Sequence, residues 1–168
     1  AIWLPEVIAA LTKQKLSPDQ IISVDTGSND GSVKLLKSAG YTPISIERNA
    51  SFGSAINAAL EHSRTKRAPE GVTEWIWLVH DDCAPAATAL HELIDSVSQR
   101  PNVAMAGPKL RGWHDRSHLL EIGVSIAPNG ARWTGLETLE KDQGQHDDVS
   151  EVDGQERSIH SSHVQPRV

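Results

Sequence analysis

The stretch IISVDTGSNDGS, residues 21–32, changes character at its midpoint. Its first five residues are a mostly apolar run that ends in Asp25, and the remainder is small or polar and contains Asp30. The first half is typical of a short buried strand. Gly27 and Gly31 would let the following backbone come close to a ligand. The stretch therefore predicts a strand that opens into a loop with two carboxylates.

Segments with helical spacing of apolar residues alternate with short segments of strand type. The predicted helices cover residues 4–11, 33–39, 51–63 and 90–97, and the predicted strands cover residues 21–25, 42–47, 75–80 and 103–107. WIWLVH, residues 75–80, is the strongest strand signal, because it is β-prone and apolar on both faces. Asn129 and Gly130 lie between two β-like runs and predict a hairpin. The alternation predicts an α/β domain with a mostly parallel sheet and helices on both faces.

Composition excludes several classes of protein. The length of 168 residues suits one domain with a real core. A formal net charge of -6 without a basic stripe argues against a nucleic-acid partner. Cys83 is the single cysteine, so an internal disulfide is excluded, and a reducing compartment fits. No apolar run approaches the roughly 20 residues that span a bilayer. We expect a cytoplasmic protein, with the full-length protein at the inner face of the plasma membrane.

The character of the chain changes near residue 140. Residues 140–168 contain no Leu, Phe, Tyr or Trp and are rich in Asp, Glu, Gln, Ser and His. Such a segment buries little apolar surface. The sequence predicts a core over residues 1–139 and a polar, mobile tail over residues 140–168.

Two predicted strands end in acids, the first in Asp25 and the second in Asp81 and Asp82. Parallel neighbours would bring these acids to the same edge of the sheet, where ligands bind. Gathered carboxylates repel one another unless a cation lies between them, and Mg²⁺ or Mn²⁺ with phosphate and water is the usual solution. Alternatively, each acid merely caps a turn or helix. Either acidic stretch alone favours the cap, and the two together favour the ligand site.

Rival motifs are absent. No glycine precedes Gly27, so the dinucleotide-binding fingerprint is missing, and no P-loop pattern occurs. Residues 80–83, His-Asp-Asp-Cys, would alternate faces on a strand and could not converge on one zinc ion. Cys83 is then a small packing residue, and the histidines at His160 and His163 are interpreted as accidental.

Three stretches together resemble family 2 glycosyltransferases, which have the GT-A fold. They are VDTGSNDGS at residues 24–32, RNASFGSAINAAL at residues 48–60 and WIWLVHDDCAP at residues 75–85. The resemblance covers roughly residues 3–145 and the N-terminal, donor-binding half of the family. WLPEVIAAL and DQGQHDD are most similar to actinobacterial members that build cell-envelope polysaccharides. The resemblance implies a Rossmann-like, mostly parallel GT-A sheet, incomplete at both ends of this chain.

The resemblance also implies roles for individual residues. Asp25 matches the acid that contacts the nucleobase, and Asp30 matches the second acid of the same loop. The metal-binding Asp-x-Asp motif falls on residues 80–82, with His80 in place of its first acid. Asp82 becomes the main metal ligand, His80 assists at the metal or a phosphate, and Asp81 lies near the nucleotide. The remaining implied nucleotide-site residues are Gly27, Ser28, Asn49, Phe52, Gly53 and Asn57.

The implied reaction is transfer of a sugar, with inversion, from a UDP- or dTDP-linked donor to a polysaccharide or glycolipid acceptor. Mg²⁺ or Mn²⁺ would be the cofactor. The general base of the family lies in its C-terminal half and has no counterpart in this chain, so we expect little transferase activity from this piece alone. We expect a homodimer or the missing half to cover exposed sheet edges. Two alternatives are a nucleotidyltransferase on a related fold and a non-catalytic, nucleotide-binding remnant.

Overall fold

The computed structural model describes residues 2–48, 50–63, 69–98, 100, 102–123, 125–126, 128–133, 136, 138–147 and 159–166. The chain divides into two compact units. We name the first, Ala1–Pro5 with Pro18–Val79, the loop unit. We name the second, Glu6–Ser17 with His80–Val168, the sheet unit.

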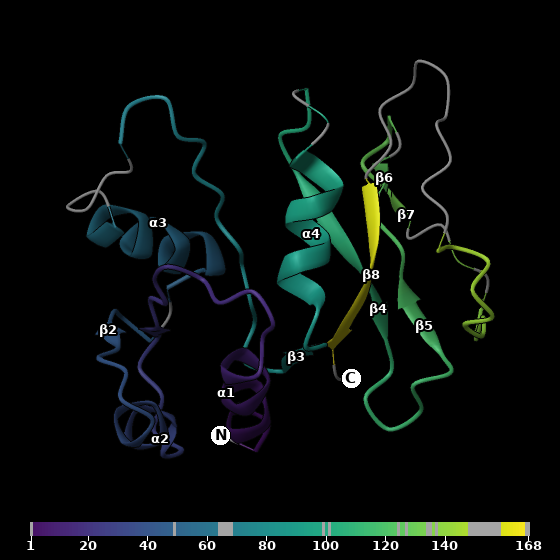
Figure 1. Ribbon diagram of the computed structural model, residues 1–168. Coiled ribbons are helices and arrows are strands. Elements are labelled where there is room, and N and C mark those ends of the chain that lie inside the picture. The colour runs from purple at the N-terminus through teal and green to yellow at the C-terminus, as the bar shows by residue number, and fades with distance from the viewer. Residues whose placement is uncertain are drawn as a thin grey trace. The chain divides into compact units, whose positions relative to one another are not determined.

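The loop unit is a small parallel βαβ arrangement followed by a helix. Its elements are β1 (Val24–Asp25), α2 (Ser32–Ser38), β2 (Ile44–Ser45) and α3 (Phe52–Ser63). β1 and β2 pair in parallel, with Val24 opposite Ile44. α3 packs against β1. Gly40 follows α2 with a φ of 89°, a conformation that glycine adopts without strain at a helix end. Figure 1 labels α2, β2 and α3.

The sheet unit contains most of α1 (Leu4–Thr12) and a mixed four-stranded sheet. The sheet has the order β3-β8-β4-β5, in which β8 is antiparallel to β3 and parallel to β4. β6 and β7 form a separate antiparallel pair. α4 packs against β4 and β8 (Figure 1). The bounds of these elements are β3 Cys83–Pro85, α4 Ala89–Ser98, β4 Ala106–Arg111, β5 Leu119–Glu121, β6 Ser125–Ile126, β7 Arg132–Trp133 and β8 Ile159–Pro166.

An apolar stripe on α4 supplies much of the buried surface of the sheet unit. Leu90, Leu93 and Val97 recur at helical spacing and are all buried. The buried side chain of Gln14 ties the end of α1 to the start of α4: its Nε2 donates to the Ala86 carbonyl at 2.7 Å, and its Oε1 accepts from the Leu90 N–H at 3.2 Å. Gln14 therefore fixes the segment between β3 and α4 by one hydrogen bond before the helix and one at its start.

The α/β class is confirmed, and so are the four predicted helices and the hairpin around Asn129 and Gly130. The predicted strand over residues 75–80 is wrong, since the structure has no strand between Pro69 and Asp82. Ile76 in this segment is 59% exposed. Apolarity makes a buried strand only where neighbouring strands supply hydrogen-bond partners and covering side chains. Here β1 pairs with β2, and β3 pairs with β8.

Part of the segment after residue 139 lies against the sheet unit. The Leu119 N–H donates to the Glu140 carbonyl at 2.9 Å, and the Asp142 N–H donates to the Ser117 carbonyl at 2.6 Å. The division into a core over residues 1–139 and a tail over residues 140–168 stays a prediction. Within the described part of the chain, the helices are all too short or too polar to span a bilayer.

Candidate functional site

Asp25, the last residue of β1, organises the loop that follows it. Its side chain is buried, with 6% of the residue exposed. Its Oδ2 accepts hydrogen bonds from the Gly27 N–H at 3.0 Å and the Ser28 N–H at 3.2 Å. A short acidic side chain that bonds backbone two or three residues ahead favours a tight turn. The carboxylate therefore fixes the path of residues 25–31, which we call the 25–31 loop.

Backbone conformation and steric crowding explain why position 27 requires glycine. Its φ is +77°, and a Cβ there would lie 2.9 Å from the Cβ of Arg48. The left-handed conformation and the close approach each disfavour a side chain. The 25–31 loop thus crosses the chain just beyond β2 at a distance that only glycine permits.

Asp30 is bound to the start of α2. Its Oδ1 accepts from the Ser32 N–H at 3.1 Å and from the Ser32 hydroxyl at 2.7 Å. Ser32 is the first residue of α2 and is buried, whereas Asp30 is exposed. This contact satisfies one of the N–H groups that a helix start leaves without an intrahelical partner. The alternative that an acid here serves the next helix therefore describes Asp30 well.

α3 carries three of the predicted nucleotide-site residues on an exposed surface. Phe52 begins the helix, and Gly53 and Asn57 lie one turn apart on a common face. Asn49, the fourth residue predicted in this stretch, lies outside the described residues. Next to the 25–31 loop is an open hollow of about 640 Å³ that Ser28 and Asn29 line together with Lys34 and Lys37 of α2.

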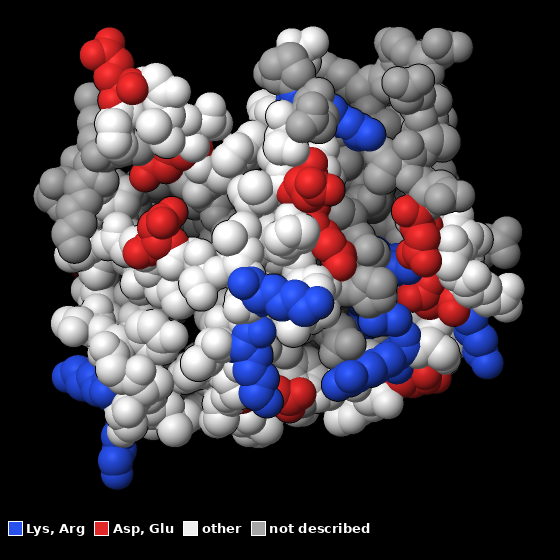
Figure 2. All heavy atoms as spheres, viewed as in Figure 1, with Lys and Arg blue, Asp and Glu red and all other residues white. Residues whose placement is uncertain are grey.

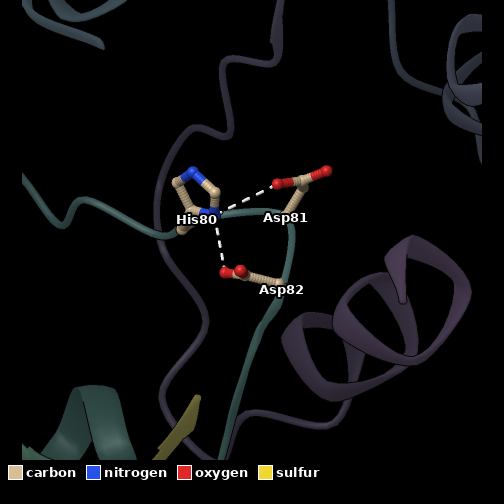
Figure 3. A group of neighbouring side chains, drawn as sticks. All are labelled: His80, Asp81 and Asp82. Carbon is tan, nitrogen blue, oxygen red and sulfur yellow. Dashed lines mark hydrogen bonds and ion pairs between the residues drawn. The ribbon is translucent and has the colours of Figure 1, made fainter. Parts of the chain in front are cut away.

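His80, Asp81 and Asp82 converge in a turn that precedes β3, which we call the 80–82 turn. The Cys83 N–H donates to the His80 carbonyl at 3.1 Å and closes it. His80 Nδ1 lies 3.1 Å from Asp81 Oδ1 and 2.5 Å from Asp82 Oδ1, as Figure 3 shows. The Asp81 and Asp82 side chains are 63% and 39% exposed. The expectation that residues 80–83 alternate faces is wrong for the first three, because they form a turn.

The side chains of the 80–82 turn fit a divalent cation. One ligand atom from each of the three lies within 4.8 Å of the others. Two carboxylate oxygens suit hard cations such as Mg²⁺ and Mn²⁺, and an imidazole nitrogen extends the set to transition metals. Cys83 is different, because burial, helped by the charge of Asp82, raises the pKa of its thiol to about 12. A neutral, half-buried thiol agrees with the packing role that the sequence predicts.

The sheet unit also contains a buried ion-pair cluster that was not predicted from the sequence. Lys109 of β4 is 1% exposed, and its Nζ donates to Asp142 at 2.8 Å and also to Asp147. Arg111 on the same strand donates to the other oxygen of Asp142 at 3.3 Å. The available signal was a lysine two residues beyond the predicted strand over residues 103–107, because an ammonium group buried next to such a strand requires carboxylate partners.

Comparison with known protein families gives a match that contains both the 25–31 loop and the 80–82 turn. Residues 2–161 match the family model of glycosyl transferase family 2. Neither the search of curated proteins nor the search of solved structures gave a significant match. The matched range contains both the 25–31 loop and the 80–82 turn, while the roles of their single residues stay predictions. Since the match covers most of its length, the chain belongs to glycosyl transferase family 2.

Proposed function

We propose that the chain binds a UDP- or dTDP-linked sugar as the donor substrate. The sugar is transferred, with inversion, to a polysaccharide or glycolipid of the cell envelope. Membership of glycosyl transferase family 2 supports the reaction class. The observation that carries the proposal is the convergence of His80, Asp81 and Asp82 on one point at the surface. The acceptor class rests on the resemblance of the sequence alone.

In this proposal the 80–82 turn holds a divalent cation. Asp82 and His80 are the main ligands, and Asp81 contributes its carboxylate from the same turn. The imidazole of His80 beside the two carboxylates favours Mn²⁺ over Mg²⁺, since Mg²⁺ prefers oxygen ligands. When bound, the ion would stabilise negative charge on the departing nucleoside diphosphate.

The 25–31 loop supplies the nucleotide contacts. Asp25 Oδ1 accepts only a long bond from the Ser28 N–H, 3.3 Å among the described residues, so it keeps capacity for another donor. The N–H of a uracil or thymine base is a donor of the required kind. The Phe52 ring and the Gly53–Asn57 face of α3 are exposed in the same unit and would shape the rest of this pocket.

Calorimetric titration tests the two assignments separately. The wild-type chain, Asp25→Ala, Asp82→Ala and a control, Asp19→Ala, are titrated with Mn²⁺ and then with UDP or dTDP. Asp19 is an exposed carboxylate outside both stretches. We expect Asp82→Ala to weaken Mn²⁺ binding by roughly a hundredfold, because even indirect partners of metal ligands change affinity by about 10- to 100-fold. Asp25→Ala should weaken the nucleotide and leave Mn²⁺ unchanged.

Each assignment has its own failing outcome. Equal Mn²⁺ affinity in Asp82→Ala and the wild type would remove the metal from the 80–82 turn. A folded wild-type chain that binds neither nucleotide in the presence of Mn²⁺ would contradict the proposed donor site. Nucleotide binding without sugar transfer in a longer gene product would favour the alternative of a non-catalytic binding module.

A further inference from the structure

The sheet unit contains a second hollow, of about 310 Å³, between α1 and the segment that follows the 80–82 turn. Its walls are small residues: Ala9 and Ala10 from α1, and Ala84, Ala86 and Ala87 after Asp82. The volume is at the lower end of the roughly 300–1,000 Å³ that ligand pockets occupy. The Lys15 N–H donates to the Ala87 carbonyl at 2.7 Å, and Gln14 Nε2 donates to the Ala86 carbonyl, so the two walls are bonded to each other.

Two cations from separate parts of the sequence line this hollow. Lys13 directly follows α1, and Arg116 comes from the connection between β4 and β5. Glu6 is the carboxylate of the lining. Figure 2 shows Lys and Arg side chains gathered in the lower middle of the view, over α1 and the neighbouring strands. Two cations against one carboxylate leave an excess of positive charge in a protein whose net charge is -6.

The acid beside Arg116 in the sequence does not neutralise it. Asp115 Oδ1 accepts from the Ser117 N–H at 2.9 Å and from the Ser117 hydroxyl at 2.6 Å. Its Oδ2 lies 2.8 Å from His118 Nδ1. Within the described part of the chain, neither Lys13 nor Arg116 takes part in an ion pair. Both cations are therefore available to an anionic ligand.

We propose that this hollow binds a phosphate group carried by the acceptor substrate. Naming the acceptor rests on the proposed function, whereas the preference for phosphate rests on the two cations. A phosphate monoester carries about -1.5 to -2 charges and three acceptor oxygens, which two cations from different segments can share. Ala84 is the second residue after Asp82, so at most about 7 Å of chain separates the hollow from the 80–82 turn. A phosphate here would hold the acceptor beside the reacting donor.

Nuclear magnetic resonance of the wild-type chain at low ionic strength, titrated with inorganic phosphate, tests the site. We expect saturable shifts of the backbone amides of Ala9, Ala10, Ala84, Ala87 and Arg116, weakened by added salt. Lys13→Gln and Arg116→Gln should each weaken the affinity by roughly three- to tenfold. Lys13→Arg should retain it. Lys141→Gln removes the same charge from an exposed position outside the hollow and should leave it unchanged.

The outcomes separate this inference from the proposed function. Absence of saturable shifts in the wild type, or unchanged affinity in the Lys13→Gln, Arg116→Gln double variant, would overturn the phosphate site even if UDP and Mn²⁺ bind. Phosphate binding without any nucleotide binding would overturn its assignment to an acceptor. A hexose phosphate and a prenyl phosphate in phosphatidylcholine vesicles then distinguish a soluble acceptor from a lipid-linked one. If neither binds more tightly than inorganic phosphate, the acceptor assignment fails.

Discussion

The two compact units have interiors of different kinds. In the sheet unit the buried residues are mainly apolar, with the α4 stripe at their centre. In the loop unit the buried described residues are Leu4, Asp25 and Ser32, and two of these three are polar. The sheet unit is therefore stabilised chiefly by apolar burial, whereas the 25–31 loop is stabilised by carboxylates that bind backbone N–H groups.

The same difference separates two acidic stretches that look alike in the sequence. Asp25 is buried and already bonded to its own loop, whereas Asp81 is exposed, Asp82 is partly exposed and, among the described residues, both face His80. The Oδ2 of Asp25 therefore determines the local structure and only its Oδ1 keeps capacity for a ligand, whereas both carboxylates of the 80–82 turn are accessible to a ligand. Substitutions in the two units should therefore change stability by different amounts.

The largest effect is expected at the buried ion pair of the sheet unit. Lys109→Met leaves the carboxylate of Asp142, whose side chain is 9% exposed, without its ammonium partner. Removing one partner of a buried pair typically lowers the free energy of unfolding by about 3–5 kcal/mol. Urea unfolding of this variant is compared with that of Lys141→Met at an exposed position, where a change within about 0.5 kcal/mol is expected. Similar losses in both would show that the cluster adds little.

The pH dependence of stability tests the same cluster from both ends. Burial opposes the charge on Asp142, but the hydrogen bonds from Lys109 and Gly144 and the charges of Lys109 and Arg111 together outweigh it, and the pKa of Asp142 is lowered. Burial likewise opposes the charge on Lys109, but Asp142 and Asp147 outweigh it, and the pKa of Lys109 is raised. The Asp142 contribution is present above the unfolded pKa of about 3.9 and is lost as pH falls through the lowered value.

The Lys109 contribution has the opposite sign. It is complete below the unfolded pKa of about 10.4 and is lost as pH rises through the raised value. Urea unfolding of the wild type and of Lys109→Met from acid to alkaline pH should therefore show a stability difference that is greatest between these limits. A difference that does not change with pH would contradict the ion-pair account.

These effects also show which features the sequence could predict. α4 was predictable because Leu90, Leu93 and Val97 repeat at helical spacing, which is a local property. Gly130 in the β6–β7 hairpin was predictable for the same reason, since the turn chemistry lies within a few residues. The 25–31 loop begins at the position where the sequence changes from apolar to small residues, as predicted.

Long-range relations could not be predicted in the same way. The partner of Lys109 lies 33 residues away in a stretch that composition assigns to a tail. The segment over residues 75–80 has every local property of a strand, but strand formation depends on neighbours that local sequence does not specify. The convergence of side chains in the 80–82 turn was not predicted for the same reason, because these residues were expected to alternate along that strand.

A smaller effect is expected in the 25–31 loop, where two glycines form a matched pair. Gly27→Ala and Gly31→Ala both place a side chain at a positive φ, 77° and 90°, which costs about 1–2 kcal/mol. Only at position 27 does the new Cβ also meet Arg48, while nothing lies within 4 Å at position 31. Overpacking should add about 1–3 kcal/mol. Thermal unfolding should rank Gly27→Ala below Gly31→Ala, and equal losses would mean that the contact with Arg48 relaxes freely.

The smallest effects on stability are expected for the acids themselves. The loss should be larger for Asp25 in the loop unit than for Asp82 in the sheet unit. Asp25→Ala leaves the Gly27 and Ser28 N–H groups without their acceptor, which should lower the free energy of unfolding by about 1–3 kcal/mol. Asp82→Ala removes a partly exposed carboxylate from the 80–82 turn and should change stability by no more than about 0.5 kcal/mol. Urea unfolding without metal measures both. A loss in Asp82→Ala as large as in Asp25→Ala would mean that the 80–82 turn is built by its acids, and the contrast between a structural and an available carboxylate would fail.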